Sequence, residues 1–296
     1  ELGPVFDVTL DGEDGAPVGG EVEHAGLIAA LVNSSENAHD RVGARLVPLA
    51  HAAFEPMLEV LVREAGARLA YLMIPKVESA TEFDAAVEAV DRATNEAGLE
   101  RRIPLHALVE THGALREVQQ IAAHSRVESL SFGLMDFVSS HRGAIPHSAM
   151  TAEGQVTHPL VVRAKLEIAA ACHGFGKTPS HCVVTEFKEP KLLQRVAERA
   201  CRQFGYTRMW SIHPDQVRVI VEAFAPTAAE VDLAVEVLVD AEAANWGPIR
   251  HRHLGREQLH DRASYRYFWQ VLERAHRTSV QGDPQLPTEI HRRWFS

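Results

Sequence analysis

Short apolar runs alternate with longer amphipathic runs along the first three quarters of the chain. The short runs are rich in aliphatic residues, and several are apolar throughout, as in strands that are covered on both faces. The longer runs repeat their apolar residues at helical spacing. The pattern predicts strands over Val5–Leu10, Val42–Val47, Leu69–Ile74, Ile103–Val109, Val127–Phe132, His181–Thr185 and Thr207–Ile212. It predicts helices over Val22–Val32, Phe54–Ala65, Ala80–Ala97, Ala114–Ala123, Pro159–Cys172, Pro190–Phe204 and Gln216–Phe224, with a short segment at Phe137–Ser140.

Strands separated by helices of this length form βαβ units and therefore a parallel sheet. A doubly wound open sheet is the weaker alternative, because no Gly-rich phosphate loop follows the first strand. The sequence predicts an α/β fold of the TIM (β/α)8-barrel kind with a C-terminal helical extension. Seven strands are predicted where a closed barrel has eight. Since the chain begins almost directly at a strand, we expect the first barrel strand upstream of residue 1.

The pattern changes after Pro226. Helices are predicted over Ala228–Ala244 and Asp261–Ala275, with no strand behind the first of them. The segment His251–His260 is polar and reads as irregular, and Pro284–Ser296 reads as an extended tail. We therefore expect a barrel domain over residues 1–226 and an extension over 227–296, which would cap the barrel or dock on a neighbouring subunit.

Composition restricts the class of protein. A chain of 296 residues, 46% of them hydrophobic, can bury a core without disulfides. Its three cysteines show no paired metal-ligand spacing, which fits a reducing compartment. The formal net charge of −10 argues against a nucleic-acid partner. No apolar run approaches the roughly 20 residues of a membrane span, and the first residues do not read as a signal peptide. We expect a cytoplasmic protein with small-molecule partners.

Ionisable residues gather where the predicted strands end, which is where parallel barrels carry their chemistry. Glu110 and Asp136 follow consecutive strands, so their carboxylates are expected to be neighbours. Two oxygen ligands completed by water and substrate oxygens suit Mg²⁺. The alternative is that Glu110 caps the helix at Ala114 and Asp136 caps the turn that follows it.

Arg45 lies inside an apolar strand and must face a partner, because a guanidinium does not lose its charge. It would bind a substrate carboxylate or stabilise an enolate oxygen. The alternative is a buried ion pair with Glu13 or Asp14, and the two interpretations are compatible.

The first strand leads into an acidic turn with Asp11, Glu13 and Asp14 between glycines. Such a turn could order metal-bound water, or it could be an ordinary solvated loop. Lys76, after the third strand, would contact an anionic substrate or pair with these acids. His112 and His213 also follow strands, but no zinc-type spacing joins them, and we interpret both as supporting groups.

Six segments in consistent order resemble the HpcH/HpaI aldolase and citrate lyase β-subunit superfamily, on the side that includes malyl-CoA and citramalyl-CoA lyases. LDGEDGAP is similar to the family's acidic turn, although GEDG stands where LEDA is common. VGARLV resembles the strand with the substrate arginine, and MIPKVES its PKVES segment. LVETHGAL and SFGLMDF resemble the strands with the metal-binding glutamate and aspartate, and SIHPDQV its IHPxQ signature. The resemblance covers roughly residues 5 to 240.

The resemblance implies roles for individual residues. Glu110 and Asp136 match the Mg²⁺ ligands, with Mn²⁺ as a substitute, and Arg45 matches the arginine that binds the substrate oxyanion. Glu13 and Asp14 match the acids that order metal water. With Lys76 and Met135 included, the expected substrate contacts are Arg45, Lys76, Glu110, Met135 and Asp136. The resemblance also implies a homotrimer or hexamer whose C-terminal segment covers a neighbour's site.

The activity that these expectations describe is a Mg²⁺-dependent carbon–carbon lyase that cleaves a β-hydroxy acid or its CoA thioester in a retro-aldol or retro-Claisen reaction. The expected catalytic residues are Arg45, Glu110 and Asp14, with Asp14 acting as a base through water; a carboxylate of another subunit is the alternative base. Two other functions stay open. One is a malyl-CoA-type thioester hydrolase, and the other is a non-catalytic subunit of a larger lyase complex.

Overall fold

The computed structural model describes residues 3–278 and 286–295 and divides into two compact units. The larger, which we call the barrel unit, is Phe6–Ile220, and the smaller, the C-terminal unit, is Val221–Ser296 together with Glu1–Val5. Each unit has its own hydrophobic core. Within the described residues, no helix combines the length and the apolar character needed to cross a bilayer.

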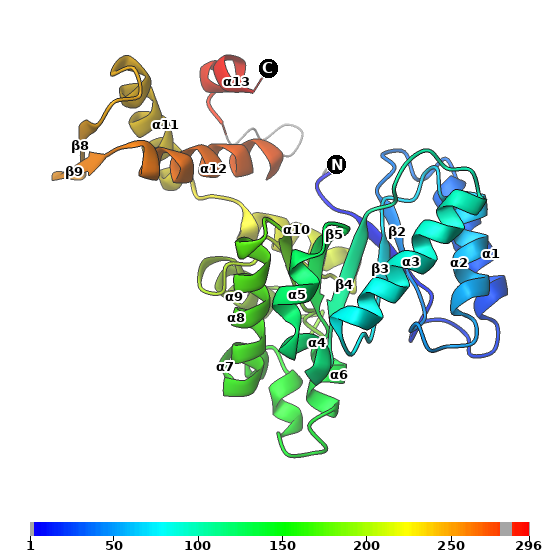
Figure 1. The fold of residues 1–296 in the computed structure, drawn as a ribbon. Helices are drawn as coiled ribbons and strands as arrows, with labels where there is room; N and C mark the ends of the chain where they lie inside the picture. Colours follow the sequence, from blue (N-terminus) through cyan, green and yellow to red (C-terminus); the bar gives the residue numbers. More distant parts are fainter. Residues whose placement is uncertain (1–2, 279–285, 296) are drawn as a thin grey trace. The chain divides into compact units, whose positions relative to one another are not determined.

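The barrel unit is built on a sheet of seven described strands, all parallel and arranged in chain order (Figure 1). This confirms the predicted α/β class and the barrel type of sheet. The strands are β1 Val8–Asp11, β2 Val42–Arg45, β3 Leu72–Ile74, β4 Leu105–Val109, β5 Val127–Phe132, β6 Thr178–His181 and β7 Arg208–Met209.

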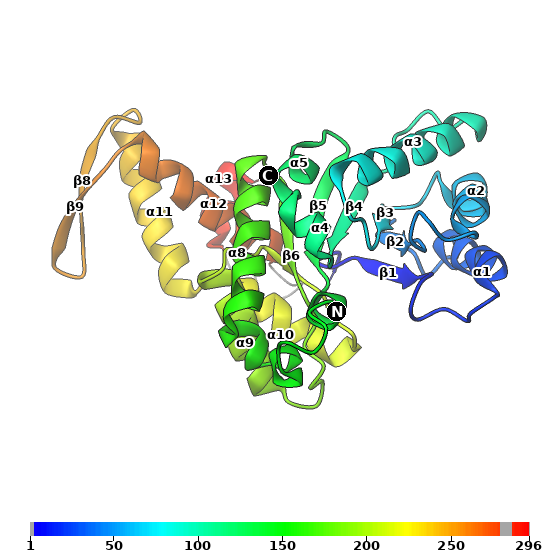
Figure 2. The ribbon, with the colours of Figure 1, turned by 60° about the horizontal axis from the view of Figure 1, so that its bottom comes forward.

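Helices cover the outer side of this sheet and pack in sequence, α1 on α2, α2 on α3, α3 on α5 and α5 on α8. Figure 1 and Figure 2 show α3, α5 and α8 along that side. Their apolar faces and the strands form one core, which excludes water from the layer between sheet and helices. The helices are α1 Glu21–Asn33, α2 Phe54–Ala65, α3 Ala80–Glu96, α4 His112–Arg116, α5 Val118–Ala123, α6 Leu134–Ser139, α7 Gly154–Thr157, α8 Pro159–Gly174, α9 Pro190–Arg202 and α10 Pro214–Phe224, with a 3-10 turn η1 at His147–Met150.

The sheet curls so that its first and last strands are joined by side chains. The Arg208 guanidinium on β7 donates from Nη2 to Oδ2 of Asp7, directly before β1, at 2.6 Å. The same guanidinium lies over the ring of Tyr71, 6.0 Å from its centroid. Tyr71 in turn stacks on His106 of β4, with ring centroids 3.9 Å apart. A layer of polar and aromatic groups therefore fills the curl at the N-terminal ends of the strands.

Several elements of the barrel unit differ from the prediction, among them η1 and α7, which were not predicted. The sixth strand was expected at His181–Thr185, but it is Thr178–His181, because a polar run makes the ladder with β5 and β7. The single helix expected over Ala114–Ala123 is two helices, α4 and α5, which meet at Glu117.

The C-terminal unit contains α11 Ala228–Ala243, an antiparallel hairpin of β8 Ile249–His253 and β9 Arg256–His260, and the helices α12 Arg262–Thr278 and α13 Thr288–Trp294. The expected irregular segment at 251–260 is therefore wrong, since a strand pair follows α11. The turn of this hairpin is Leu254-Gly255, both at positive φ (46° and 80°), as a two-residue hairpin turn requires. The expected extended tail is also wrong where it is described, because α13 forms there.

Candidate active site

The residues singled out at the strand ends meet at one edge of the sheet. Asp11 ends β1 and Arg45 ends β2, and the two are partners in the strand register. Lys76 lies two residues beyond the end of β3, and Glu110 directly follows β4. Asp136 lies in the first turn of α6, after β5. Because all these strands are parallel, their carboxyl ends meet at the same edge.

The Arg45 guanidinium is held by two carboxylates. It donates from Nε and Nη2 to the two oxygens of Asp11, at 2.8 and 2.6 Å, and its Nη1 lies 2.7 Å from Oε2 of Glu13. Asp14 is more distant, with Oδ2 4.0 Å from Nη1. The buried ion pair that the sequence suggested for Arg45 is therefore present, with Glu13 as its partner. The bidentate partner is Asp11, which the sequence analysis had named only as a member of the acidic turn. The signal for it was the alignment of the ends of β1 and β2.

These contacts set the charge of the acidic turn. Burial would raise the pKa of Asp11, but hydrogen bonds from Arg45 and from the amides of Glu13 and Gly15 outweigh it and lower the pKa. For Glu13 the balance is the opposite. Its side chain is only 6% exposed, and burial raises its pKa even though Arg45 and Lys76 are close. The contacts thus shift the pKa values of Asp11 and Glu13 in opposite directions.

Lys76 joins three strand ends. Its Nζ lies 2.8 Å from Oε1 of Glu13, 3.2 Å from Oδ1 of Asp14 and 3.8 Å from Oδ1 of Asp136. Its backbone is in the left-handed region, at φ 50°, which is strained for a residue with a side chain. In that conformation its N–H donates to Oε1 of Glu110 at 2.9 Å. Burial opposes the charge of Lys76, but Glu13 outweighs it and raises the pKa of the ammonium.

Glu110 is buried, with 2% of its surface exposed, whereas the Asp136 side chain is 43% exposed. Burial, followed by the negative charge of Asp136, raises the pKa of Glu110 to about 8. Glu110 does not cap α4, because Thr111 Oγ1 accepts the hydrogen bond from the Ala114 amide. The capping alternative for Glu110 is therefore wrong, and its carboxylate needs another explanation.

The donor set fits a hard divalent cation. Five carboxylates (Asp11, Glu13, Asp14, Glu110 and Asp136) surround two cationic side chains, Arg45 and Lys76. Like charges raise each other's energy, and next to burial the charge of Asp136 contributes to the raised pKa of Glu110. A cation bound by Glu110 and Asp136 would remove that repulsion, and carboxylate oxygens beside open solvent are the ligands that Mg²⁺ takes in proteins.

The remaining expected residues contact other groups of the protein. Met135 is partly buried and packs against the core of the barrel unit. His112 contacts protein groups, with Nε2 3.1 Å from Ser140 Oγ and its ring edge-on to Phe137. His213 stacks on Phe187, with ring centroids 5.2 Å apart. The sequence reasoning missed one supporting residue besides Asp11. It is Gln216, whose amide donates to the Val184 carbonyl at 2.8 Å and accepts from the Ile212 amide at 3.0 Å.

Comparison with known proteins shows which family and which solved structures the chain is similar to. A family model described as HpcH/HpaI aldolase/citrate lyase matches residues 7–214. The crystal structure of a citrate lyase from Burkholderia xenovorans is 49% identical and superposes with a TM-score of 0.85 over 96% of this chain and 88% of that chain. Because the superposition covers 96% of this chain, it extends well past the barrel unit.

Two further relatives are more distant. An L-malyl-CoA/β-methylmalyl-CoA lyase of Cereibacter sphaeroides is 32% identical over 197 residues, which are 62% of this chain and 60% of that lyase. The chain thus spans less than two thirds of that enzyme's length. The protein CitE of Mycobacterium tuberculosis, in complex with magnesium and pyruvate, is 26% identical with a TM-score of 0.59, over 75% of this chain and 82% of that chain.

Proposed function

Because the chain belongs to the HpcH/HpaI aldolase/citrate lyase family, we propose that it is a Mg²⁺-dependent carbon–carbon lyase acting on a β-hydroxy acid or its CoA thioester. One observation carries the proposal. The buried carboxyl of Glu110, with its pKa raised to about 8, shares a sheet edge with Asp136, Arg45 and Lys76. The relatives add support, since one is named a malyl-CoA lyase and another was crystallised with magnesium and pyruvate.

Glu110 and Asp136 would hold the cation, with Mn²⁺ as an alternative to Mg²⁺. When bound, the ion supplies positive charge that orients and polarises the oxygens of the substrate. The Lys76 amide fixes one oxygen of Glu110, so this ligand is already oriented before the cation binds. Asp136 is half exposed and therefore accessible to both the ion and the substrate.

Arg45 and Lys76 would bind the acidic end of the substrate and offset negative charge as it develops. Asp11 and Glu13 hold the guanidinium in one orientation, which is the pre-organisation that electrostatic stabilisation needs. Three of its five N–H groups face these acids, which leaves the others for a ligand. Met135, next to Asp136, would contact the substrate from α6.

The reaction requires a base and then an acid. A base takes the proton of the substrate hydroxyl, whose carbon becomes a carbonyl carbon. The bond to the neighbouring carbon breaks, and its electron pair passes to the carbon beside the carboxylate or thioester, which then takes a proton. Asp14, with a side chain 57% exposed, would act as this base through water.

The domain and partner assignments complete the proposal. Residues 1–226 would carry the chemistry, and residues 227–296 would cap a site or join subunits in a homotrimer or hexamer. The partners are then small oxo or hydroxy acids and CoA thioesters, without nucleic acid or membrane.

The test uses the purified full chain after treatment with EDTA, with and without added Mg²⁺, on a panel of β-hydroxy acids and their CoA thioesters. We expect Mg²⁺-dependent release of an oxo acid or aldehyde together with the shortened acid or acyl-CoA. A free hydroxy acid with an intact carbon skeleton would identify a thioester hydrolase instead. No turnover on any substrate with Mg²⁺ present would contradict both enzymes and favour the non-catalytic subunit.

A further inference from the structure

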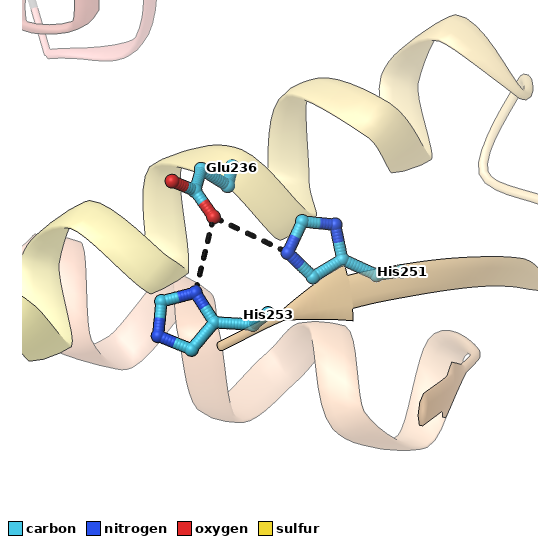
Figure 3. Close-up of side chains that lie close together, drawn as sticks. All are labelled: Glu236, His251 and His253. Carbon is cyan, nitrogen blue, oxygen red and sulfur yellow. Dashed lines mark hydrogen bonds and ion pairs between the residues drawn. The ribbon is translucent and has the colours of Figure 1, made fainter. Parts of the chain in front are cut away.

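A second group of possible metal ligands lies in the C-terminal unit, apart from the residues discussed above. It consists of Glu236 on α11 and of His251 and His253 on β8, whose ligand atoms all lie within 4.8 Å of one another (Figure 3). The two histidines are two residues apart on a strand, so they project from the same face of the hairpin. That face also carries Ile249, which is buried, so the pair is directed toward α11.

The distances are those of a small coordination sphere. Oε2 of Glu236 lies 3.3 Å from Nε2 of His251 and 3.3 Å from Nδ1 of His253. Two ligands of a tetrahedral zinc ion, each about 2.0–2.1 Å from the metal, are roughly 3.3–3.4 Å apart. An octahedral ion with the same bond lengths would bring neighbouring ligands to roughly 2.9 Å. Two of the three edges therefore already have tetrahedral length.

The state of His251 is the observation that points to a ligand. Nδ1 of His251 lies 2.8 Å from Oδ2 of Asp240, and since a carboxylate only accepts, Nδ1–H is the donor. In the neutral ring Nε2 then carries a lone pair. This nitrogen is buried, on a side chain 9% exposed, and has no hydrogen-bond partner although the Glu236 carboxylate is 3.3 Å away. A lone pair facing a carboxylate oxygen is repulsive unless a proton or a metal ion lies between them.

Asp240 has the position of a residue that orients a metal-bound histidine. It is one helical turn beyond Glu236 on α11, and it binds the ring nitrogen of His251 that does not face Glu236. Histidines that bind a metal commonly donate their other N–H to a carboxylate in this way. Helix α11 would thus supply both a ligand and the group that orients a second ligand.

We propose that Glu236, His251 and His253 form a zinc-binding site, with Asp240 orienting His251 and a fourth position left for water. Two imidazoles and one carboxylate are a ligand set that suits Zn²⁺ rather than Mg²⁺. The ion would fasten the β8–β9 hairpin to α11. The inference is independent of the lyase assignment, because no residue of the two sites is shared.

The test is a zinc titration of the EDTA-treated full chain against a chromogenic chelator, in a large excess of Mg²⁺. We expect one saturable Zn²⁺ site per chain that persists in Asp136→Ala, which separates it from the proposed magnesium site. His253→Ala and Glu236→Gln should each weaken zinc binding by about 100-fold or more, and Asp240→Asn by about 10–100-fold. His39→Ala, which removes an exposed histidine of the barrel unit, is the matched control and should leave the affinity unchanged.

A second measurement guards against variants that fold poorly. Zn²⁺ binding to the native chain should raise its Tm, by linkage, and should not raise the Tm of His253→Ala. X-ray absorption at the zinc edge should show two imidazole ligands and otherwise oxygen. Equal zinc affinity in the wild type and in His253→Ala, or no zinc bound beyond the site lost in Asp136→Ala, would overturn the proposal and leave an ion pair of Glu236 with the two histidines.

Discussion

Two backbone features, in addition to the surrounding charges, fix the Glu110 carboxylate. The first is the Lys76 amide, which donates to Oε1 from a left-handed conformation. The second is the missing side chain of Gly133, because a Cβ there would collide with Cβ and Oε2 of Glu110. Gly133 has φ −91°, so an alanine would be allowed by its backbone and excluded only by its neighbour. The position of the carboxylate thus depends on the end of the next strand.

Gly133→Ala should displace Glu110 and weaken Mg²⁺ binding by at least about 10-fold, the lower range found for groups that orient ligands. Calorimetric titration with Mg²⁺ measures this. Gly26→Ala is the matched control, because a Cβ there meets open space on α1, and its affinity should equal that of the wild type. An unchanged affinity in Gly133→Ala would show that Glu110 does not need its present position to bind the ion.

Asp136→Ala should abolish Mg²⁺-dependent turnover, because one of two carboxylate ligands is lost, while the free energy of unfolding changes little. The side chain is 43% exposed, and the Nζ of Lys76, with which it forms an ion pair, is 3.8 Å away. Steady-state assays measure the turnover, and urea unfolding measures the free energy of unfolding. The control is Asp232→Ala, which removes an exposed carboxylate and should change neither the turnover nor the free energy of unfolding. Wild-type turnover in Asp136→Ala would remove this residue from the site.

At the scale of elements, the motifs that suggested the family also join secondary structures. Ser79 caps α3 by accepting from the Glu82 amide, and Thr111 caps α4 in the same way. Gly113 leaves room for the Glu78 carbonyl. Gln216 links the loops that follow β6 and β7. The segments with Lys76 and Glu110 therefore each combine a charged residue at the candidate site with a neighbour that holds the loop.

The hydrophobic pattern predicted elements well where strands face the core and poorly where they carry polar residues inward. The first five strands were all predicted within a few residues, because their apolar side chains pack beneath the helices. The prediction placed the sixth strand too far along the chain, over the apolar residues Cys182, Val183 and Val184. In the structure β6 forms over the polar run before them. For the candidate site, the positions of the strand ends predicted that Arg45 and Glu110 lie at the same edge of the sheet. That Asp11 is the partner of Arg45 follows only from the register of β1 and β2, which the sequence pattern does not give.

The polar run of β6 faces a buried lysine. Lys165 on α8 is fully buried, and its Nζ donates to Oε1 of Gln155 at 3.0 Å and lies 2.7 Å from Nε2 of His181. Nδ1–H of His181 donates to the Cys182 carbonyl, which leaves Nε2 as the acceptor for the ammonium. Burial lowers the pKa of Lys165 to about 8 and that of His181 well below its ordinary value.

This lysine should make stability depend on pH. Below about pH 8 Lys165 is protonated in both the folded and the unfolded chain, so it does not make the free energy of unfolding depend on pH. Between about 8 and 10.5 only the unfolded chain holds it, and the free energy of unfolding gains a rising contribution as pH increases. Relative to Lys165→Met, the wild type should gain stability across that interval, by on the order of 3 kcal/mol at most. Urea unfolding at several pH values measures the difference.

An exposed lysine serves as the control for this pH series. Lys191→Met on α9 should show the same pH dependence as the wild type. Parallel curves for the wild type and Lys165→Met between pH 8 and 10.5 would contradict the assigned origin of the slope.

For the barrel unit as a whole, closure of the curl depends on side chains at the N-terminal ends of the strands. Asp7 accepts from Arg208 on the last strand and also from Arg41 directly before β2, whose Nε lies 2.9 Å from Oδ1. The first contact joins residues 201 positions apart, and the second joins neighbouring parts of the sheet. The ion pair with Arg208 therefore holds distant parts of the chain together.

Arg208→Met should lower the free energy of unfolding by about 1.5 kcal/mol, the lower end of the range for hydrogen bonds to charged groups, because the pair is partly exposed. Arg41→Met is the matched control, since it removes the other cation on the same carboxylate, one that is more exposed and bridges only adjacent segments. We expect the smaller loss for Arg41→Met in urea unfolding. Equal losses in the two variants would show that closure of the curl contributes nothing beyond an ordinary surface ion pair.

The left-handed backbone at Lys76 has a consequence for engineering this protein. Glycine adopts that conformation without strain and keeps the amide that donates to Glu110, so the substitution would delete the ammonium and leave the carboxylate in place. Few charged positions in a barrel mouth can be neutralised without disturbing a neighbour. If Lys76 selects the substrate as we propose, its charge could be redesigned separately from the backbone contact that orients Glu110.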